Sequence, residues 1–415
     1  MTDRPDLPGP NLRRGPRPLL LHLTLAAMRS AASRGTSLNW SNDWPMSNAA
    51  SAAILRSIQQ AGATGTIDVQ AAVAAEVTRQ DADLIAGIAA YRRHPWRRDL
   101  LDVQLIWQEG GSSLFDFAPN SDGPVILFVP SLINRAYILD LQSGGSMMRW
   151  FAAQGARPLL LDWGTPGDLE REFTLTDYVA GRLERALTAT VQLTGNHPFL
   201  AGYCMGGTLA VAAAQRREDL IEGLILLAAP WDFHAPDDSR ADQAIQALDA
   251  LEPIMRLNAV LPVDCLQSLF ALLDPWSVAD KYRRFGRLKQ DSDVVRRFVA
   301  MEDWLNDGVP LAAPVARACL ADWYGRNLPA KGQWRIAGMA IDPAAIQRPS
   351  FVAIPSQDRI VPPESATALA TRLRFPAVHR PSAGHIGMAA GPRAEKELWK
   401  PLWEWLKHQC TMTLH

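Results

Sequence analysis

One cysteine of the 415-residue chain stands where a nucleophile is expected. Cys204 lies in Ala-Gly-Tyr-Cys-Met-Gly-Gly-Thr, between an apolar stretch over residues 198–203 and an alanine-rich stretch over 208–215. Gly202 and Gly206 flank it, as a strand-to-helix turn too tight for side chains requires. Such a turn would expose the sulfur and set it over a helix N-terminus, which favours the thiolate. The pattern therefore predicts a nucleophile rather than a buried packing residue.

Two further residues complete the chemistry that such a thiol needs. Asp358 follows an apolar stretch over residues 349–355, and His385 stands in a glycine-containing loop 27 positions later. In α/β-hydrolases the chain order is nucleophile, acid, histidine, with the last two after late strands. We therefore expect His385 to move the proton and Asp358 to orient its ring, making Cys204, Asp358 and His385 the catalytic residues. Taken singly, each of the last two is more often an ordinary turn or loop residue.

An acyl-transfer site also needs donors for the oxyanion. One is the backbone N–H of the residue after the nucleophile, here Met205, and the other comes from the loop after an early strand. Residues 124–130 read as that strand, so Ile133 is our candidate for the second donor, with Leu132 left open. Ordinary loop packing is the alternative for each of these residues.

The chain resembles the polyhydroxyalkanoate synthase family of α/β-hydrolases. The stretches that carry the resemblance are the Pro-Ser-Leu-Ile-Asn loop at 130–141, Asp-Trp-Gly-Thr-Pro at 162–166, the cysteine box at 202–208, Asp-Arg-Ile-Val-Pro at 358–362 and Gly-His-Ile at 384–386. A tryptophan segment over 304–307 is also similar to one that the family places near its nucleophile. The resemblance implies a cytoplasmic acyltransferase that polymerises 3-hydroxyacyl-CoA, with no cofactor and no metal, at polyester granules. Trp304 and Asn134 are our candidates for the substrate pocket.

Cysteine chemistry supports this interpretation separately. Acyl transfer from CoA to cysteine exchanges one thioester for another, and the acyl-cysteine survives for attack by a hydroxyl if water is excluded. Departures from the family pattern are Arg359, where many synthases have histidine, and a length between those of the single-subunit and two-subunit enzymes. A cysteine thioesterase or depolymerase and a non-catalytic granule protein stay open as alternatives. A homodimer and an accessory subunit are both open.

The elements that must position these residues predict an α/β-hydrolase fold with a mostly parallel central sheet. We expect the core in two parts, residues 92–230 and 349–415, with strands near 103–108, 113–117, 124–130, 198–203, 224–228 and 349–355. The intervening residues 231–348 exceed what one crossover needs, and helical spacing over 244–251, 261–273 and 293–301 predicts a mostly helical cap. Residues 17–91 form a helical extension, with helices near 49–56 and 69–91, after a disordered tail over 1–16.

Composition sets limits on partners and compartment. The 42 Lys and Arg balance 43 Asp and Glu, so no net field recruits nucleic acid. Four cysteines without paired or metal-ligand spacing indicate free thiols in a reducing cytoplasm. The apolar run at 19–28 is too short to span a bilayer and is interrupted by His22. We expect it to form an amphipathic helix that packs on the core or touches a granule, rather than an export signal.

Overall fold

The computed structural model describes residues 13–35, 53, 56, 57, 60, 69–98 and 103–413. The chain divides into two compact units. We call residues 1–97 and 267–306 the helical unit, and residues 98–266 and 307–415 the sheet unit. The segment 231–348, expected as one cap, is thus shared between the two units. Most of the tail expected to be disordered and most of the helix expected near 49–56 lie outside the described residues.

An eight-stranded sheet forms the centre of the sheet unit. Its strands run in the order β1-β2-β4-β3-β5-β6-β11-β12. The β1/β2 and β2/β4 pairs are antiparallel, and the other five pairs are parallel, which confirms the predicted α/β class. The bounds are β1 Gln104–Glu109, β2 Ser112–Asp116, β3 Val125–Val129, β4 Arg157–Asp162, β5 Phe199–Tyr203, β6 Gly223–Leu227, β11 Ser350–Ala353 and β12 Pro376–His379.

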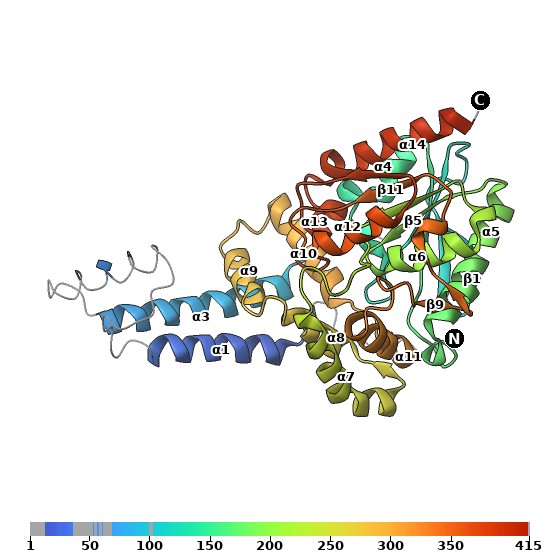
Figure 1. Cartoon of the computed structure of the whole chain (residues 1–415). Coiled ribbons are helices and arrows are strands. Elements are labelled where there is room, and N and C mark those ends of the chain that lie inside the picture. The colour runs from blue at the N-terminus through green and yellow to red at the C-terminus, as the bar shows by residue number, and fades with distance from the viewer. Residues whose placement is uncertain are drawn as a thin grey trace. The chain divides into compact units, whose positions relative to one another are not determined.

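Both faces of this sheet are covered, which explains why its central strands are continuously apolar. Strand β3 is buried along its whole length. Val125, Leu127 and Val129 join the buried side chains of α5 (Glu184–Thr194) and α6 (Met205–Arg216). On the opposite face Phe128 contacts Phe151 of α4 (Met147–Ala153), with ring centroids 6.1 Å apart. Aromatic rings of α14 (Lys400–Thr413) pack on β5 and β11, so α4 and α14 share that second face (Figure 1).

The sheet unit also contains further helices and two small strand pairs. Its other α-helices are α7 Ser239–Asn258, α11 Ala313–Arg317, α12 Pro363–Arg372 and α13 His385–Ala390. Two small antiparallel pairs are formed by β7 Val260–Leu261 with β8 Leu311–Ala312, and by β9 Arg335–Ile336 with β10 Met339–Ala340. Three segments have π-helical geometry, at Asp177–Leu183, Ala318–Gly325 and Glu395–Trp399. The sequence pattern did not predict these π-helical segments.

The helical unit is built from α1 Leu19–Gly35, α3 Val69–Arg93, α9 Ser277–Gly286 and α10 Asp293–Asn306. The end of α8, Val263–Ala271, also belongs to it. Its core is small and aromatic: Tyr91, Tyr282 and Phe285 are wholly buried. Helices α3 and α9 approach closely at Gly87, where an added Cβ would lie 2.0 Å from the backbone oxygen of Tyr282. Glycine is therefore required there by packing between helices, although it sits in a helix interior.

The apolar run at residues 19–28 is helical, as predicted. Ala26 of α1 is buried in the core of the helical unit, so the expected packing role is confirmed. Leu20 and Met28 on the same helix are exposed, at 77% and 61%. Among the described residues, no helix combines the length and the apolar character needed to cross a bilayer.

Candidate functional site

Cys204 lies on a strained turn between β5 and α6. Its φ is +56°, a left-handed conformation that is uncommon outside glycine and recurs at functional sites. The backbone N–H of Cys204 donates to the carbonyl of Leu227 on β6, 2.9 Å away, which ties the turn to the neighbouring strand. The residue is half-buried and directly follows the carboxyl end of β5.

The glycines around the cysteine are required by close backbone packing. A Cβ on Gly206 would lie 2.2 Å from the backbone oxygen of Val129 on β3. A Cβ on Gly202 would lie 2.4 Å from the Cα of Gly207. These positions hold α6 directly against the sheet, with the helix N-terminus beneath the sulfur. The structure therefore has the tight strand-to-helix turn that the sequence predicts.

His385 and Asp358 meet at the carboxyl end of the parallel strands, the end at which Cys204 lies. Asp358 follows β11, and His385 is the first residue of α13, after β12. His385 Nδ1 lies 2.7 Å from Asp358 Oδ2, and both side chains are buried. The other carboxylate oxygen accepts hydrogen bonds from the backbone N–H groups of Ile360 and Val361, each at 2.9 Å. Asp358 is thus fixed in place and can orient the imidazole, leaving Nε2 for the sulfur.

The electrostatics of His385 depend on both partners. Burial favours the neutral ring, but it is outweighed by the negative charge of an ionised Cys204, by hydrogen bonds to Asp358 and Cys204, and by the charge of Asp358. Together they raise the pKa of His385 from 6.5 to about 10. The structure therefore brings Cys204, His385 and Asp358 into one hydrogen-bonded group, with the imidazole between the sulfur and the carboxylate.

Tyr203 supports this histidine and was missed by sequence reasoning. Its hydroxyl donates to the backbone oxygen of His385 at 3.2 Å, and the two rings lie 5.2 Å apart between centroids. Burial, with the nearby negative charges of Cys204 and Asp358, raises the pKa of Tyr203 well above 10, so it stays a neutral donor. Its place inside the cysteine box, directly before the nucleophile, is the signal that could have revealed it.

The candidate oxyanion donors come from the start of α6 and from the loop after β3. Met205 opens α6, so its backbone N–H is one of the first of the helix and has no acceptor within it. The N–H of Ile133 donates to the hydroxyl of Ser131 at 3.2 Å, and its carbonyl accepts from the N–H of Val309 at 3.1 Å. The N–H of Ile133 thus has an acceptor in this structure, and the choice between Ile133 and Leu132 as second donor stays a prediction.

The same loop is braced from two sides. The indole N–H of Trp163, after β4, donates to the backbone oxygen of Pro130 at 2.9 Å. Asp307 lies 3.8 Å from the guanidinium of Arg135 and accepts from the hydroxyl of Tyr137 at 3.3 Å. Two of the stretches quoted in the sequence, 162–166 and 304–307, thus contribute residues that support the loop after β3.

The two candidate pocket residues fall in different places. Asn134 pairs with Gly308 through backbone bridging, and its side-chain oxygen is buried without a hydrogen-bond partner among the described residues. Trp304 is buried on α10 in the helical unit. Its place in a substrate pocket stays a prediction.

Other aromatic and histidine residues of the expected cap have structural roles. Trp231, Trp323 and Trp334 pack edge-to-face in the core of the sheet unit. His234 Nε2 lies 2.9 Å from the backbone oxygen of Tyr324, so it is tied to the chain rather than to the cysteine. Among the described residues no cluster of three or more His, Cys, Asp or Glu side chains is suited to a metal ion.

A strained nucleophile turn on a mostly parallel sheet, with an acid and a histidine after later strands, defines an α/β-hydrolase architecture. The chain belongs to the alpha/beta hydrolase fold family, whose model matches residues 124–392. A monoacylglycerol lipase structure from Paleococcus ferrophilus is 17% identical, with a TM-score of 0.46, covering 74% of this chain and 100% of the lipase.

Curated relatives confirm the resemblance found in the motifs. The chain is similar to the poly(3-hydroxyalkanoate) polymerase subunit PhaC of Allochromatium vinosum, at 29% identity over 70% of this chain and 83% of the relative. PhaC of Synechocystis sp. is 28% identical over 74% of this chain and 84% of its own length. PhaC of Haloferax mediterranei is 29% identical over 68% of this chain, but only 58% of that longer protein is covered.

Proposed function

We propose that this chain is an acyltransferase of the polyhydroxyalkanoate synthase type. It polymerises 3-hydroxyacyl-CoA through an acyl-cysteine intermediate and releases CoA. The observation that carries the proposal is the position of Cys204 on its strained turn, within hydrogen-bonding reach of a histidine that Asp358 orients. Similarity to PhaC polymerase subunits supplies the substrate class.

In the first step Cys204 takes the acyl group. His385 accepts the thiol proton, and the thiolate attacks the carbonyl carbon of the acyl-CoA thioester. The oxyanion of the tetrahedral intermediate is held by the N–H of Met205 and by a second N–H from the loop after β3. The C–S bond to CoA breaks, and the CoA sulfur takes the proton from His385. One thioester has replaced another, so this step is close to thermoneutral.

In the second step the acyl group moves to a hydroxyl. His385 accepts the proton of the 3-hydroxyl of another hydroxyacyl unit, and the oxygen attacks the acyl-cysteine carbonyl. The new ester forms, the C–S bond to Cys204 breaks, and the proton returns to the sulfur. Asn134, a residue of the loop after β3, is our candidate for contact with the substrate in this step.

The direct test is incubation of the full chain with 3-hydroxybutyryl-CoA, following CoA release and the fate of the acyl group. A synthase releases CoA and deposits insoluble polyester. Release of CoA with free 3-hydroxybutyrate would identify a cysteine thioesterase or depolymerase instead. If CoA release equals that of the Cys204→Ala variant, the chain is a non-catalytic, granule-associated protein.

Subunit arrangement belongs to the same proposal. Relatives bearing the word subunit in their names favour an accessory partner, whereas a homodimer would act alone. Light scattering of the purified chain, followed by the polymer assay with and without host-cell extract, separates the two. Polymer formation by the purified dimer would exclude the need for a partner. Fractionation with polyester granules tests the granule association expected of such an enzyme.

A further inference from the structure

Tyr203 is the last residue of β5, and Cys204 follows it directly. Its side chain is buried and makes two contacts with His385. The hydroxyl donates to the backbone oxygen of His385 at 3.2 Å, and the two ring centroids lie 5.2 Å apart with 34° between the ring planes. One side chain on the strand that leads to the nucleophile therefore contacts both the backbone and the ring of the histidine.

His385 depends on such contacts because its own helix is short. Helix α13 has six residues, one of which is Gly387. A helix of this length with a glycine inside has little stability of its own. The carbonyl of Ala383, just before it, accepts from the N–H of Gln357 at 3.0 Å, which ties this segment to the one that carries the acid. The hydroxyl of Tyr203 supplies the corresponding anchor toward β5.

The orientation of the imidazole needs more than one contact. The hydrogen bond from Nδ1 to Asp358 Oδ2, at 2.7 Å, still lets the ring tilt about the line that joins these two atoms. The ring of Tyr203 lies beside the imidazole and limits this tilt. Nε2, which must reach the sulfur of Cys204, is thus directed by Asp358 and Tyr203 together. Packing and further hydrogen bonds of this kind are what hold reacting groups in a productive geometry.

Tyr203 itself stays out of the proton transfers. Burial is the main cause that raises its pKa well above 10, and negative charge at Cys204 and Asp358 adds to it. A phenol of this kind neither gives up nor takes up a proton near pH 7, because its pKa is far from the working pH. The hydroxyl therefore remains a hydrogen-bond donor, and Tyr203 acts on the reaction only through His385.

We propose, on the basis of the function proposed above, that Tyr203 is a positioning residue for both steps of acyl transfer. It keeps Nε2 of His385 within reach of the Cys204 thiol in the first step and of the incoming hydroxyl in the second. One nitrogen takes both protons, so a displacement of about 1 Å would slow each step. Because Tyr203 and Cys204 are adjacent in the chain, the base is anchored to the strand that carries the nucleophile.

Kinetics of two variants test this role in the full chain. Tyr203→Phe keeps the ring and removes the hydroxyl, whereas Tyr203→Leu removes both contacts. With 3-hydroxybutyryl-CoA, we expect kcat for CoA release to fall about tenfold in Tyr203→Phe and about 10²-fold in Tyr203→Leu. KM should change less than about twofold, because the contacts with the substrate are untouched. A kcat equal to that of the wild type in both variants, or a loss confined to KM, would overturn the proposal.

A spectroscopic readout tests the same contact without substrate. The chain is labelled with ¹⁵N-histidine, and the Nδ1–H signal of His385 is assigned by its absence from His385→Gln. Exchange of this proton with water should be about tenfold faster or more in Tyr203→Leu, because the imidazole is then free to tilt. Unchanged exchange in both variants would contradict the positioning role. If the wild type releases no CoA, the proposed function fails, and the exchange rate alone decides the role of Tyr203.

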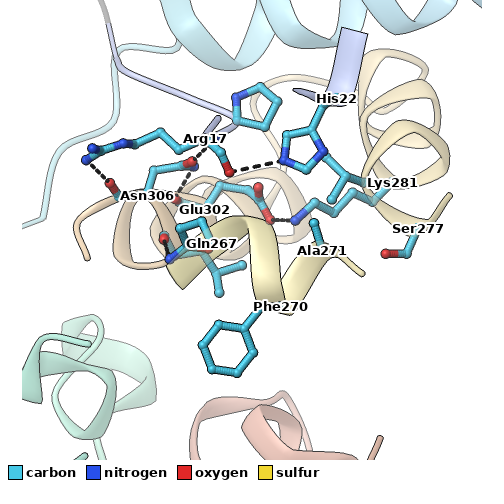
Figure 2. A pocket seen from close by; sticks show the side chains of 12 residues that line it. Arg17, His22, Gln267, Phe270, Ala271, Ser277, Lys281, Glu302 and Asn306 are labelled. Carbon is cyan, nitrogen blue, oxygen red and sulfur yellow. Dashed lines mark hydrogen bonds and ion pairs between the residues drawn. The ribbon is translucent and has the colours of Figure 1, made fainter. Parts of the chain in front are cut away.

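The matched control removes another buried tyrosine hydroxyl. Tyr282 of the helical unit donates to Glu302 at 2.9 Å, and Glu302 also pairs with Lys281 beside a cavity that His22 lines as well (Figure 2). Tyr282→Phe should leave kcat within about twofold of the wild type and leave the His385 signal unchanged. If Tyr203→Leu fails to fold, Tyr203→Phe, which removes a single oxygen atom, decides alone. Equal losses of kcat in Tyr203→Phe and Tyr282→Phe would show a general loss of stability and overturn the proposal.

Discussion

The sheet unit and the helical unit place their buried polar groups by different means. In the sheet unit Cys204, Asp358 and His385 all follow parallel strands. The topology of the sheet therefore brings them together at the carboxyl ends of those strands. In the helical unit His22 and Glu302 lie on helices far apart in sequence, and only the packing of those helices brings them to one cavity. The first arrangement can be recognised from chain order, whereas the second cannot.

Removal of the sulfur should have the largest effect. Cys204→Ala should lower CoA release from 3-hydroxybutyryl-CoA by about 10⁴-fold or more, because the proposed mechanism carries the acyl chain on this sulfur. Cys204→Ser should retain little activity. Cys410→Ala, at a half-buried cysteine far along the chain, is the control and should keep its activity. Full activity in Cys204→Ser would refute the thioester argument.

Loss of the orienting carboxylate should come next. Asp358→Asn keeps the size of the side chain but can stabilise the wrong tautomer of His385, so CoA release should fall by about 10³-fold to 10⁴-fold. Steady-state kinetics should show the loss in kcat. The control, Asp342→Asn, removes a half-buried carboxylate that caps a short turn and should change kcat less than about twofold. A change confined to KM would mean that Asp358 does not act through the histidine.

Substitution of one glycine in each unit compares how tightly the backbone packs in the two units. Gly206→Ala in the sheet unit and Gly87→Ala in the helical unit each put a Cβ about 2 Å from backbone oxygen, at 2.2 Å and 2.0 Å. We expect each to lower the free energy of unfolding by about 3 kcal/mol. Gly387→Ala in α13, where the added Cβ meets nothing within 4 Å, is the control and should be neutral or stabilising.

Hydrogen exchange should show which elements are destabilised by each glycine substitution. Gly206→Ala should release protection in β5 and α6, and Gly87→Ala in α3 and α9. If either substitution costs less than about 1 kcal/mol in denaturant unfolding, the close backbone approach at that glycine is absent from the protein in solution.

The last prediction concerns the pH dependence of stability. The folded-state pKa of His385 is raised from 6.5 to about 10, so its contribution to the free energy of unfolding is complete below pH about 6.5 and lost as the pH rises through about 10. The stability difference between wild type and His385→Gln should therefore shrink between pH about 6 and pH about 10.5. His408→Gln, at an exposed histidine, should show no such trend. A difference that grows with pH would contradict the raised pKa.

Much of the sheet unit could be predicted from the sequence. The stretches expected as strands near 124–130, 198–203 and 349–355 correspond to β3, β5 and β11, because buried parallel strands are short continuous apolar runs between turn residues. The residues around Cys204 also predicted the strand-to-helix turn on which it lies. Chain order also brought Asp358 and His385 to the end of the sheet that holds Cys204, and their catalytic roles rest on the proposal above.

What the sequence could not predict depends on contacts between distant segments. The hydrogen bond from Ile133 to Ser131 occupies an expected oxyanion donor, and nothing in the loop pattern reveals it. Strand β12 was not expected, because none of its four residues is buried and they give no apolar run. The division of residues 231–348 between two units follows from helix packing at positions such as Gly87, which no local periodicity encodes.

The central claim is that Cys204 carries the acyl group, and mass spectrometry tests it most directly. The full chain is exposed briefly to 3-hydroxybutyryl-CoA, quenched in acid, digested and searched for acylated peptides. The account predicts hydroxybutyryl adducts on the peptide that contains Cys204, absent from Cys204→Ala. Adducts only at Cys265, Cys319 or Cys410, or CoA release without an adduct on Cys204 at any time point, would contradict it.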